Sequence, residues 1–496
     1  MNIQDAPVKY TIISDLHLGH TLRSQTERLR SGAPLAFSKL RTVVKMDRAL
    51  SFFFETVLLN GAVAATERVL VLNGDIFDFL HVDVQPETGT FQTPPIDGSQ
   101  EKLYGLSFEE SRSRWKLGLI AQLHRRVFEA FARFVSAGGR IVFVIGNHDV
   151  DLCFESIQHD LRSYILDKVP SEARVKSEDA IQIEPWFFLS PPFVYMEHGH
   201  RFDPYTTFAD PLVPTSIFES AQLAPNFAHF GLRYFANRVP SFPIYDLEQA
   251  PWTKIYGWVR SHSIRESMLA LWAAFHFFFM YWTAMLSERR EWHENQGDNR
   301  FARRERLVHI ARRFGWNQRR VYLLDALKAD PVGHSAAVFV RALQLDRIAI
   351  LIGLTLFWVA LAMSNYHARF SFALLLGLFA MALWWFLDRG RPHADLHPQL
   401  GDIANDIGRI ARVPIVVFGH THQATCESHG RVIWLNPGSW EHLAHDGHHD
   451  EEPGLVHYGE ISRLDSGVSA ELRWFSVVNK KHGLVKRRIA TFRGAS

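Results

Sequence analysis

The chain has 496 residues, more than a typical single domain, so we expect a core domain with a large accessory part. Apolar residues make up 47% and charged residues 21%, which excludes a wholly disordered chain. The net charge of +2 gives no argument for nucleic acid as a partner. Two cysteines, Cys153 and Cys426, make neither a disulfide framework nor a CxxC metal site. The first residues, MNIQDAPVKY, lack the basic and apolar regions of a secretory signal, so the core is expected on the cytosolic side.

Five short apolar runs, typical of strands that are buried on both faces, each end at a polar motif. The runs cover 8–14, 69–72, 140–145, 193–196 and 414–418. This pattern is typical of an open α/β sheet, in which a site forms beyond the strand ends. Between the runs, 46–60 and 117–137 have apolar residues at helical spacing, which predicts helices. The stretch 85–105 is rich in Pro, Gly and Thr, which indicates an extended loop near the site.

The fold class is α/β, with a layered sheet core flanked by helices and interrupted by a large helical insertion. We expect 1–202 and 406–496 to form the two parts of the core and 203–405 to form the insertion or lid. The insertion contains three apolar stretches, 268–286, 348–363 and 370–387.

The polar motifs supply residue types that bind metals. They are Asp15-Leu16-His17, Gly74-Asp75-Ile76-Phe77-Asp78, Gly146-Asn147-His148-Asp149, His198-Gly199 and Gly419-His420-Thr421-His422. Side chains at i and i+2 of an extended segment point the same way, so two of these motifs can each present a pair of ligands. The pairs are Asp15 with His17 and His420 with His422. Two cations about 3.5–4 Å apart need a bridging oxygen ligand. Asp75 is the natural bridge, and Asn147 offers an amide oxygen.

Over roughly residues 8–200 and 412–440, these motifs resemble those of the calcineurin-like metallophosphoesterase superfamily. The resemblance includes Asn436-Pro437-Gly438-Ser439 after the last histidine pair, and it implies a layered sheet core of that type. One metal would be held by Asp15, His17, Asp75 and His422. The second metal would be held by Asp75, Asn147, His198 and His420. His148 would lie by the leaving group as an acid or stabiliser, with Asp149 orienting it and Asp78 behind the ligands. His200 stands where several lipid-precursor hydrolases of the family have Asp.

The resemblance implies hydrolysis of a phosphoester. Two cations lower the pKa of a bound water, and the hydroxide attacks phosphorus in line while the metals and His148 stabilise the developing charge. Mixed His, Asp and Asn ligation suits Mn, Fe or Zn better than Ca or Mg. Each motif is weak alone, but five in this order, with no ligand missing, favour a functional site over a decayed pseudoenzyme.

Three further features have ordinary interpretations that we favour. The tract 441–450 (EHLAHDGHHD) is expected to be an exposed histidine-rich loop rather than a second metal site. Cys426 is expected to be a small buried residue. His276, which lies in an aromatic run, is expected to be a packing histidine.

The stretches 348–363 and 370–387 contain 16 and 18 residues without a charge, close to the roughly 20 residues that span a bilayer. Arginines flank the pair on both sides, so the positive-inside rule predicts a membrane hairpin at 348–387 with both ends in the cytosol. His198 and His420 must meet in one site, so the chain between them must cross a membrane an even number of times. We therefore expect 268–286 to be a lid or an in-plane interfacial helix. A buried two-helix cap is the alternative for the hairpin.

Residues 288–320 contain ten arginines and five acidic residues, which fits either anionic lipid headgroups or a solvated helical face. We expect a membrane-associated hydrolase of a lipid-linked phosphoester or pyrophosphate. The bacterial lipid A precursor pyrophosphatases resemble this plan, although His148 stands where their GN(R)D motif has Arg. The alternatives are a soluble phosphodiesterase or nuclease with a helical cap, and a non-catalytic membrane scaffold.

Overall fold

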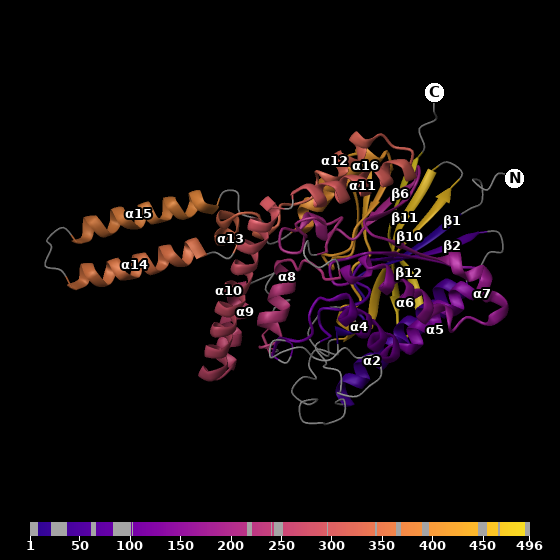
Figure 1. The fold of residues 1–496 in the computed structure, drawn as a ribbon, viewed down its shortest axis with the longest axis horizontal. Coiled ribbons are helices and arrows are strands. Elements are labelled where there is room, and N and C mark those ends of the chain that lie inside the picture. Colours follow the sequence, from indigo (N-terminus) through magenta and orange to yellow (C-terminus); the bar gives the residue numbers. More distant parts are fainter. Residues whose placement is uncertain are drawn as a thin grey trace.

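The computed structural model describes residues 8–20, 37–60, 66–82, 101, 103–215, 221–239, 241–242, 251–294, 296–342, 345–363, 369–388, 396–444, 454–464 and 467–491. Most of the expected loop at 85–105 and most of the tract at 441–450 lie outside these residues. Figure 1 shows a layered body that contains the strands, and a pair of helices that projects from it.

The larger sheet has seven strands in the order β12-β11-β10-β1-β2-β3-β4. The strands are β1 (Val8–Ile13), β2 (Glu67–Asn73), β3 (Arg140–Val144), β4 (Ile181–Glu184), β10 (Leu455–Leu464), β11 (Gly467–Ser476) and β12 (Lys481–Thr491). The first four are parallel, and the last three form an antiparallel extension. The apolar runs at 8–14, 69–72 and 140–145 are confirmed as strands, and they are apolar throughout because both faces of the sheet are covered.

The smaller sheet has five strands in the order β5-β6-β7-β9-β8. They are β5 (Phe187–Ser190), β6 (Val194–Glu197), β7 (Ile415–Val417), β8 (Thr425–His429) and β9 (Val432–Asn436). β6 and β7 are parallel neighbours, although the whole insertion separates them in the sequence. Their carboxyl ends therefore meet at one edge of the sheet, which brings His198 close to His420.

The two sheets pack face to face between layers of helices, which gives a four-layer arrangement (Figure 1). Side chains such as Val71, Met196 and Leu435 fill the space between the sheets. The outer face of the larger sheet is covered by α2 (Phe37–Phe53), α4 (Glu110–Leu123), α5 (Arg125–Ser136) and α6 (Glu155–Leu166). The outer face of the smaller sheet is covered by α11 (Gln296–Arg313), α12 (Gln318–Asp325) and α16 (His397–Ala411).

Two local predictions differ from the structure. The helix expected at 117–137 is broken at His124, where α4 ends and α5 begins. The ring of His124 is buried and its Nδ1 lies 2.8 Å from Asp47 Oδ1, so a contact with α2 favours the break. The helix expected at 46–60 is α2, continued by a π-helical segment, η3 (Phe54–Leu59).

Shorter helices complete the fold. The core adds α7 (Ser171–Ser177) and the 3-10 turns η4 (Val150–Cys153), η5 (Glu178–Ala180), η6 (His200–Phe202) and η10 (Glu441–Ala444). The insertion adds α8 (Phe227–Phe230), η7 (Gly231–Ala236), α9 (Pro251–Ser261), α10 (Ile264–Glu294), η9 (Val332–His334), α13 (Ala336–Ala342), α14 (Leu345–Met363) and α15 (Arg369–Asp388). The expected boundary at residue 405 falls inside α16, and α11 and α12 of the insertion pack on the core.

The long helix α10 has two apolar faces. Ala273, Phe277, Tyr281 and Met285 form a buried stripe four residues apart, which packs near α8, η7 and α13. On the opposite side, apolar side chains are exposed, as at Phe275, which is 70% exposed. A buried stripe of this kind ties α10 to the body.

The helices α14 and α15 form the projecting pair in Figure 1. Among the described residues, one helical segment, Ile264–Leu286, has the length and composition to cross a membrane. The apolar parts described for the pair, Ala349–Ala360 and Leu376–Trp385, are shorter. Helix length therefore gives only weak support to the hairpin expected at 348–387.

Candidate metal centre

The predicted ligands lie in loops that follow five strands, and these loops meet at one edge of the two sheets. Asp15 follows β1, Asp75 follows β2, Asn147 follows β3, His198 follows β6, and the pair His420 and His422 follows β7. Buried histidine and aspartate side chains form groups that could hold metal ions. One group is Asp15, His17 and His422, and a second is Asp75, His198 and His420.

The distances in the first group fit a shared cation. His422 Nε2 lies 3.3 Å from Asp15 Oδ1 and 3.4 Å from His17 Nε2. Two donor atoms that each lie about 2.1 Å from one cation are roughly 3.0–3.4 Å apart, depending on the coordination angle. The His422 side chain is 39% exposed, so this group has a side that faces solvent.

The second group shares its carboxylate with a third group, which contains His17 and His148. His198 Nε2 lies 3.1 Å from Asp75 Oδ2, and the ring of His198 lies 5.3 Å from that of His420. Asp75 also groups with His17 and His148, so it lies between the two sets of ligands. Its other oxygen, Oδ1, accepts a hydrogen bond of 2.8 Å from the backbone of His148, which fixes the carboxylate.

Buried polar atoms without partners indicate that these residues fit a cation. Asn147 Oδ1 and His198 Nε2 are buried and make no geometrically acceptable hydrogen bond within the described part of the chain. A buried polar atom without a partner costs roughly 1–3 kcal/mol. A divalent cation would satisfy both atoms at once, and oxygen and imidazole nitrogen are donors that transition metals accept.

The partners of the other ring nitrogens fix which nitrogen faces the cation. His198 Nδ1 lies 2.9 Å from the carbonyl oxygen of Asn73, which leaves Nε2 free for a metal. His420 Nε2 lies 3.0 Å from Asp203 Oδ2, which leaves Nδ1 free. Such partners orient metal-binding histidines in many proteins. The sequence analysis did not predict this role for Asp203. The only signal for it was a carboxylate three residues after His200.

The backbone of the ligand loops is strained. Five of the predicted ligands have a positive φ although none is glycine: Asp15, His17, Asp75, His420 and His422. This conformation costs about 1–2 kcal/mol for a residue with a Cβ atom. Strain of this kind collects at functional sites, where the surrounding structure must hold it.

Glycines give the ligands room. A Cβ atom at Gly146 would lie 2.2 Å from Asp75 Oδ1 and 2.5 Å from the backbone nitrogen of Asp75. A Cβ atom at Gly419 would lie 2.1 Å from Ser14 Oγ. These contacts are too close for any side chain, so glycine is required beneath the carboxylates.

The partner of His148 differs from the prediction. Asp149 was expected to orient His148, but its carboxylate accepts backbone N–H groups of Gly146 at 2.6 Å and Ile76 at 2.7 Å. It therefore braces the ligand loops. Asp78 takes the orienting position, with Oδ1 at 3.1 Å from His148 Nδ1. Asp78 also contacts His81, a buried residue that the sequence analysis did not select.

The charges of the site shift several pKa values. Burial opposes the charged form of His198 and His148, but neighbouring carboxylates, foremost Asp75 and Asp78 respectively, outweigh it and raise both pKa values to about 9. Burial likewise opposes ionisation of Asp75, yet His198 and His148 hold its pKa well below the usual range.

His200 differs from His198 in its charge. Burial, together with the charges of His198 and His420, holds the pKa of His200 well below its ordinary value, so the ring is neutral. Its ring lies 5.6 Å from that of His198. His200 therefore packs behind a predicted ligand rather than adding a charge.

The remaining sequence features have structural roles in the described residues. Cys426 is buried, as expected. The ring of His276 stacks between Tyr104 and Trp272, as expected for a packing histidine. In the arginine-rich stretch, Arg303 pairs with Asp325 and Arg313 with Glu184, so part of it stabilises the core.

Replacing Gly146 by alanine should weaken metal binding. We expect Gly146→Ala to lower Mn²⁺ affinity at least about tenfold, since a displaced Asp75 carboxylate disturbs both groups of ligands. Isothermal titration calorimetry on metal-free protein measures the affinity. Gly257→Ala, where an added Cβ meets nothing within 4 Å, is the control and should bind as the wild type does. Equal affinity in both variants would contradict the proposed packing.

Metal binding should release protons. His198 is protonated below a pKa of about 9 in the metal-free protein and must lose its Nε2 proton to bind a cation. Apparent Mn²⁺ affinity should therefore rise between pH 7 and pH 9. Titrations at pH 8 in two buffers with different ionisation enthalpies count the protons, and a count of zero would show that His198 is already neutral.

Comparison with known proteins adds little to this geometry. No protein-family profile matches the chain, and no curated protein matches it. Among solved structures, the chain is similar to a crystal structure of a Vps29 single mutant from Entamoeba histolytica, at 22% identity and a TM-score of 0.14. The match covers 18% of this chain and 46% of that chain, less than half the length of the neighbour.

Proposed function

We propose that this protein is a metal-dependent phosphoester hydrolase of the calcineurin-like metallophosphoesterase type. The observation that carries the proposal is the set of mostly buried groups of histidine and aspartate side chains, two of which contain Asp75. One metal would be held by Asp15, His17, Asp75 and His422. The other would be held by Asp75, Asn147, His198 and His420. A divalent pair, with Mn, Fe or Zn suited to these donors, would supply charge stabilisation and a water acidic enough to attack phosphorus near neutral pH.

The protein's own side chains handle the proton of the leaving group. Asp78 accepts the Nδ1 hydrogen of His148 and stabilises the protonated ring. Nε2–H of His148 can then be donated to the oxygen that departs from phosphorus. General acid catalysis of this kind contributes roughly 10²–10⁴-fold. Asp149 holds His148 and the proposed bridging carboxylate of Asp75 in position, because its own carboxylate accepts hydrogen bonds from the backbone next to them.

We propose further that the substrate is a phosphoester or pyrophosphate carried by a lipid, and that the site faces the cytosolic side of a membrane. The support is the apolar surface of the insertion. Leu356 on α14 and Phe379 on α15 are each 64% exposed. Further apolar side chains on α10 are also exposed. Neighbouring apolar side chains that are exposed to water mark a surface that binds a partner, and a bilayer is the simplest partner for this surface. Because β6 and β7 are neighbours, any crossing between them must be paired with a return.

Hydrolysis is tested with bis-p-nitrophenyl phosphate and Mn²⁺. We expect Asp75→Asn to reduce kcat at least about 10³-fold, because it disturbs both metals, and His148→Ala to reduce it about 10²–10⁴-fold by removing the acid. Asp160→Asn, which changes a carboxylate paired with Arg114 away from the site, is the control and should retain activity. Wild-type rates in both site variants would favour a non-catalytic scaffold.

Membrane association is tested by fractionation and vesicle flotation without detergent. We expect the wild type to float with vesicles and Leu356→Asp/Phe379→Asp to stay in the supernatant, since one aspartate at a helix centre costs about 2.5–3.5 kcal/mol on insertion. Val478→Asp places a charge at a side chain that is 72% exposed on the body, and should not change flotation. A wild type that stays in the supernatant would favour a soluble phosphodiesterase with a helical cap.

A further inference from the structure

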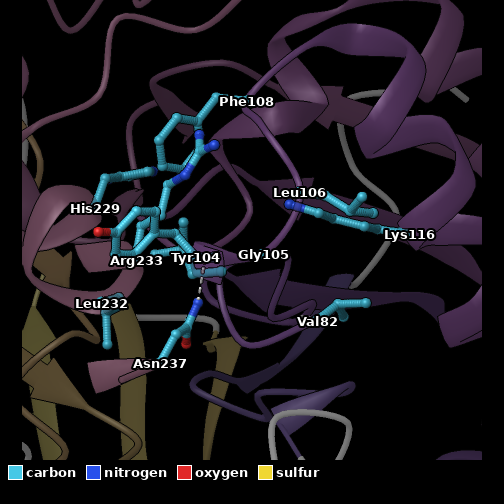
Figure 2. Close-up of a pocket in the computed structure, with 11 residues that line it drawn as sticks. Val82, Tyr104, Gly105, Leu106, Phe108, Lys116, His229, Leu232, Arg233 and Asn237 are labelled. Atoms are coloured by element: carbon cyan, nitrogen blue, oxygen red, sulfur yellow. Dashed lines mark hydrogen bonds between the residues drawn. The ribbon is translucent and has the colours of Figure 1, made fainter. Parts of the chain in front are cut away.

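A small pocket lies beside the metal centre, between the loop that follows β2 and the turn formed by α8 and η7 (Figure 2). Leu106 and Leu232 contribute apolar walls. Lys116 of α4 lies across the pocket from His229 and Arg233, and the nitrogen end of its side chain points toward them (Figure 2). The pocket therefore has two cations and one imidazole in an otherwise largely apolar lining.

The positive charge of the pocket lacks a direct counterion. Lys116 is only 3% exposed, and no hydrogen bond or ion pair reaches its ammonium group within the described residues. No acidic side chain lines the pocket. Burial therefore lowers the pKa of Lys116 to about 8, although Asp151 and Glu101 nearby oppose the shift. A buried cation without a direct partner is costly, and a bound anion would offset that cost.

Arg233 adds a second unpaired donor. Its Nε is buried and makes no hydrogen bond within the described part of the chain. The guanidinium lies over the rings of Phe108, at 5.2 Å, and Tyr234, at 5.6 Å. These rings hold the group in place without taking its hydrogen bonds, so the donor remains available to a ligand.

His229 identifies the kind of anion. Asn226 Oδ1 accepts the backbone N–H of His229 at 3.0 Å, so the side-chain atom that lies 2.6 Å from His229 Nδ1 is an oxygen. Nδ1 must therefore carry the hydrogen, which leaves Nε2 as a bare acceptor. Nε2 is buried and has no partner among the described residues. A ligand for this pocket must be an anion that also carries a hydroxyl, because Nε2 of His229 needs a hydrogen donor. A phosphate monoanion meets both needs, whereas an ionised carboxylate or a sulfate has no hydroxyl.

The pocket lies close to the metal centre. The ring of His229 packs 5.3 Å from Phe208, whose ring lies 6.3 Å from His200, the neighbour of the predicted ligand His198. Leu80 of the pocket wall lies two residues after Asp78, in the same loop. The loop after β2 and the ring of Phe208 therefore border both sites.

The apolar part of a substrate has a surface on the other side of the pocket. Tyr104, a wall residue, stacks on His276 of α10 with ring centroids 5.2 Å apart. His276 in turn stacks on Trp272, which is half-exposed on the apolar face of that helix. A polar group in the pocket would thus lie near the surface proposed to face lipid.

We propose that this pocket is an anionic subsite for a second phosphoryl group of the substrate, while the metal centre holds the phosphoryl group that is hydrolysed. The cavity of about 10 Å³ holds about one water-sized group, so one P–OH oxygen enters and the rest of the substrate stays outside. This oxygen accepts hydrogen bonds from Lys116 and Arg233 and donates its hydrogen to His229. The substrate is then a molecule with two phosphoryl groups. This inference rests on the proposed function in that one substrate occupies both sites.

The test measures anion binding without catalysis. The full chain is stripped of metal with EDTA, and binding of inorganic phosphate and of sulfate is followed by equilibrium dialysis. We expect saturable phosphate binding that Lys116→Met and Arg233→Gln each weaken at least about tenfold. Wild-type protein should bind phosphate more tightly than sulfate, and His229→Phe should abolish that preference.

Arg238→Gln is the matched control, because Arg238 lies over the outer wall residue Tyr104 but does not line the pocket. It should bind phosphate within about twofold of the wild type. Recovery of two Mn²⁺ per chain shows that Lys116→Met and Arg233→Gln have folded. Phosphate binding that survives both substitutions, or its absence in the wild type, overturns the subsite and leaves the hydrolase proposal standing. Full hydrolytic activity in Asp75→Asn overturns hydrolysis at the metal centre while phosphate binding still reports on the pocket.

Discussion

The burial of Asp75 among other charged groups is the constraint on which the rest of the structure depends. Its carboxylate belongs both to the group with His198 and His420 and to the group with His17 and His148, and burial opposes its ionisation in a water-poor site. The charges of His198 and His148 outweigh the effect of burial and hold the pKa of Asp75 well below its usual range. The strained loops and the glycines beneath the carboxylates also shape the site, since they bring the donor atoms to distances suited to cations.

The insertion is part of the site although it interrupts the domain. β6 and β7 pair across it, so the ligands on its two sides still meet. Residues just inside it complete the centre: Asp203 holds His420, and His229 lines the neighbouring pocket. Its helices α11 and α12 cover the smaller sheet, as a core element does. A change in the insertion would therefore reach the metal ligands directly.

The outer surface of the insertion has a different physical character. α10 buries one apolar stripe and exposes another. The pair α14 and α15 projects from the body (Figure 1), and apolar side chains on it are exposed. In water such surface is unfavourable by roughly 25 cal/mol per Å², so a partner that covers it is favoured. A membrane in that place would set the site beside amphiphilic molecules, which suits a pocket that combines cations with apolar walls.

The sequence by itself determined the five strands that precede the candidate ligands, because continuous apolar runs form buried parallel strands and their carboxyl ends meet at one edge. It could not determine contacts between elements far apart in the chain. The orienting role of Asp78, the bracing role of Asp149, and the partnership of Asp203 with His420 follow from the packing of separate loops. The break at His124 arose from a contact with Asp47, which helical periodicity does not record. Only the tertiary structure placed Lys116 beside His229. The burial of these two side chains, and the lack of hydrogen-bond partners for Lys116 Nζ and His229 Nε2 within the described residues, depend on residues that are near in space and far apart in the sequence.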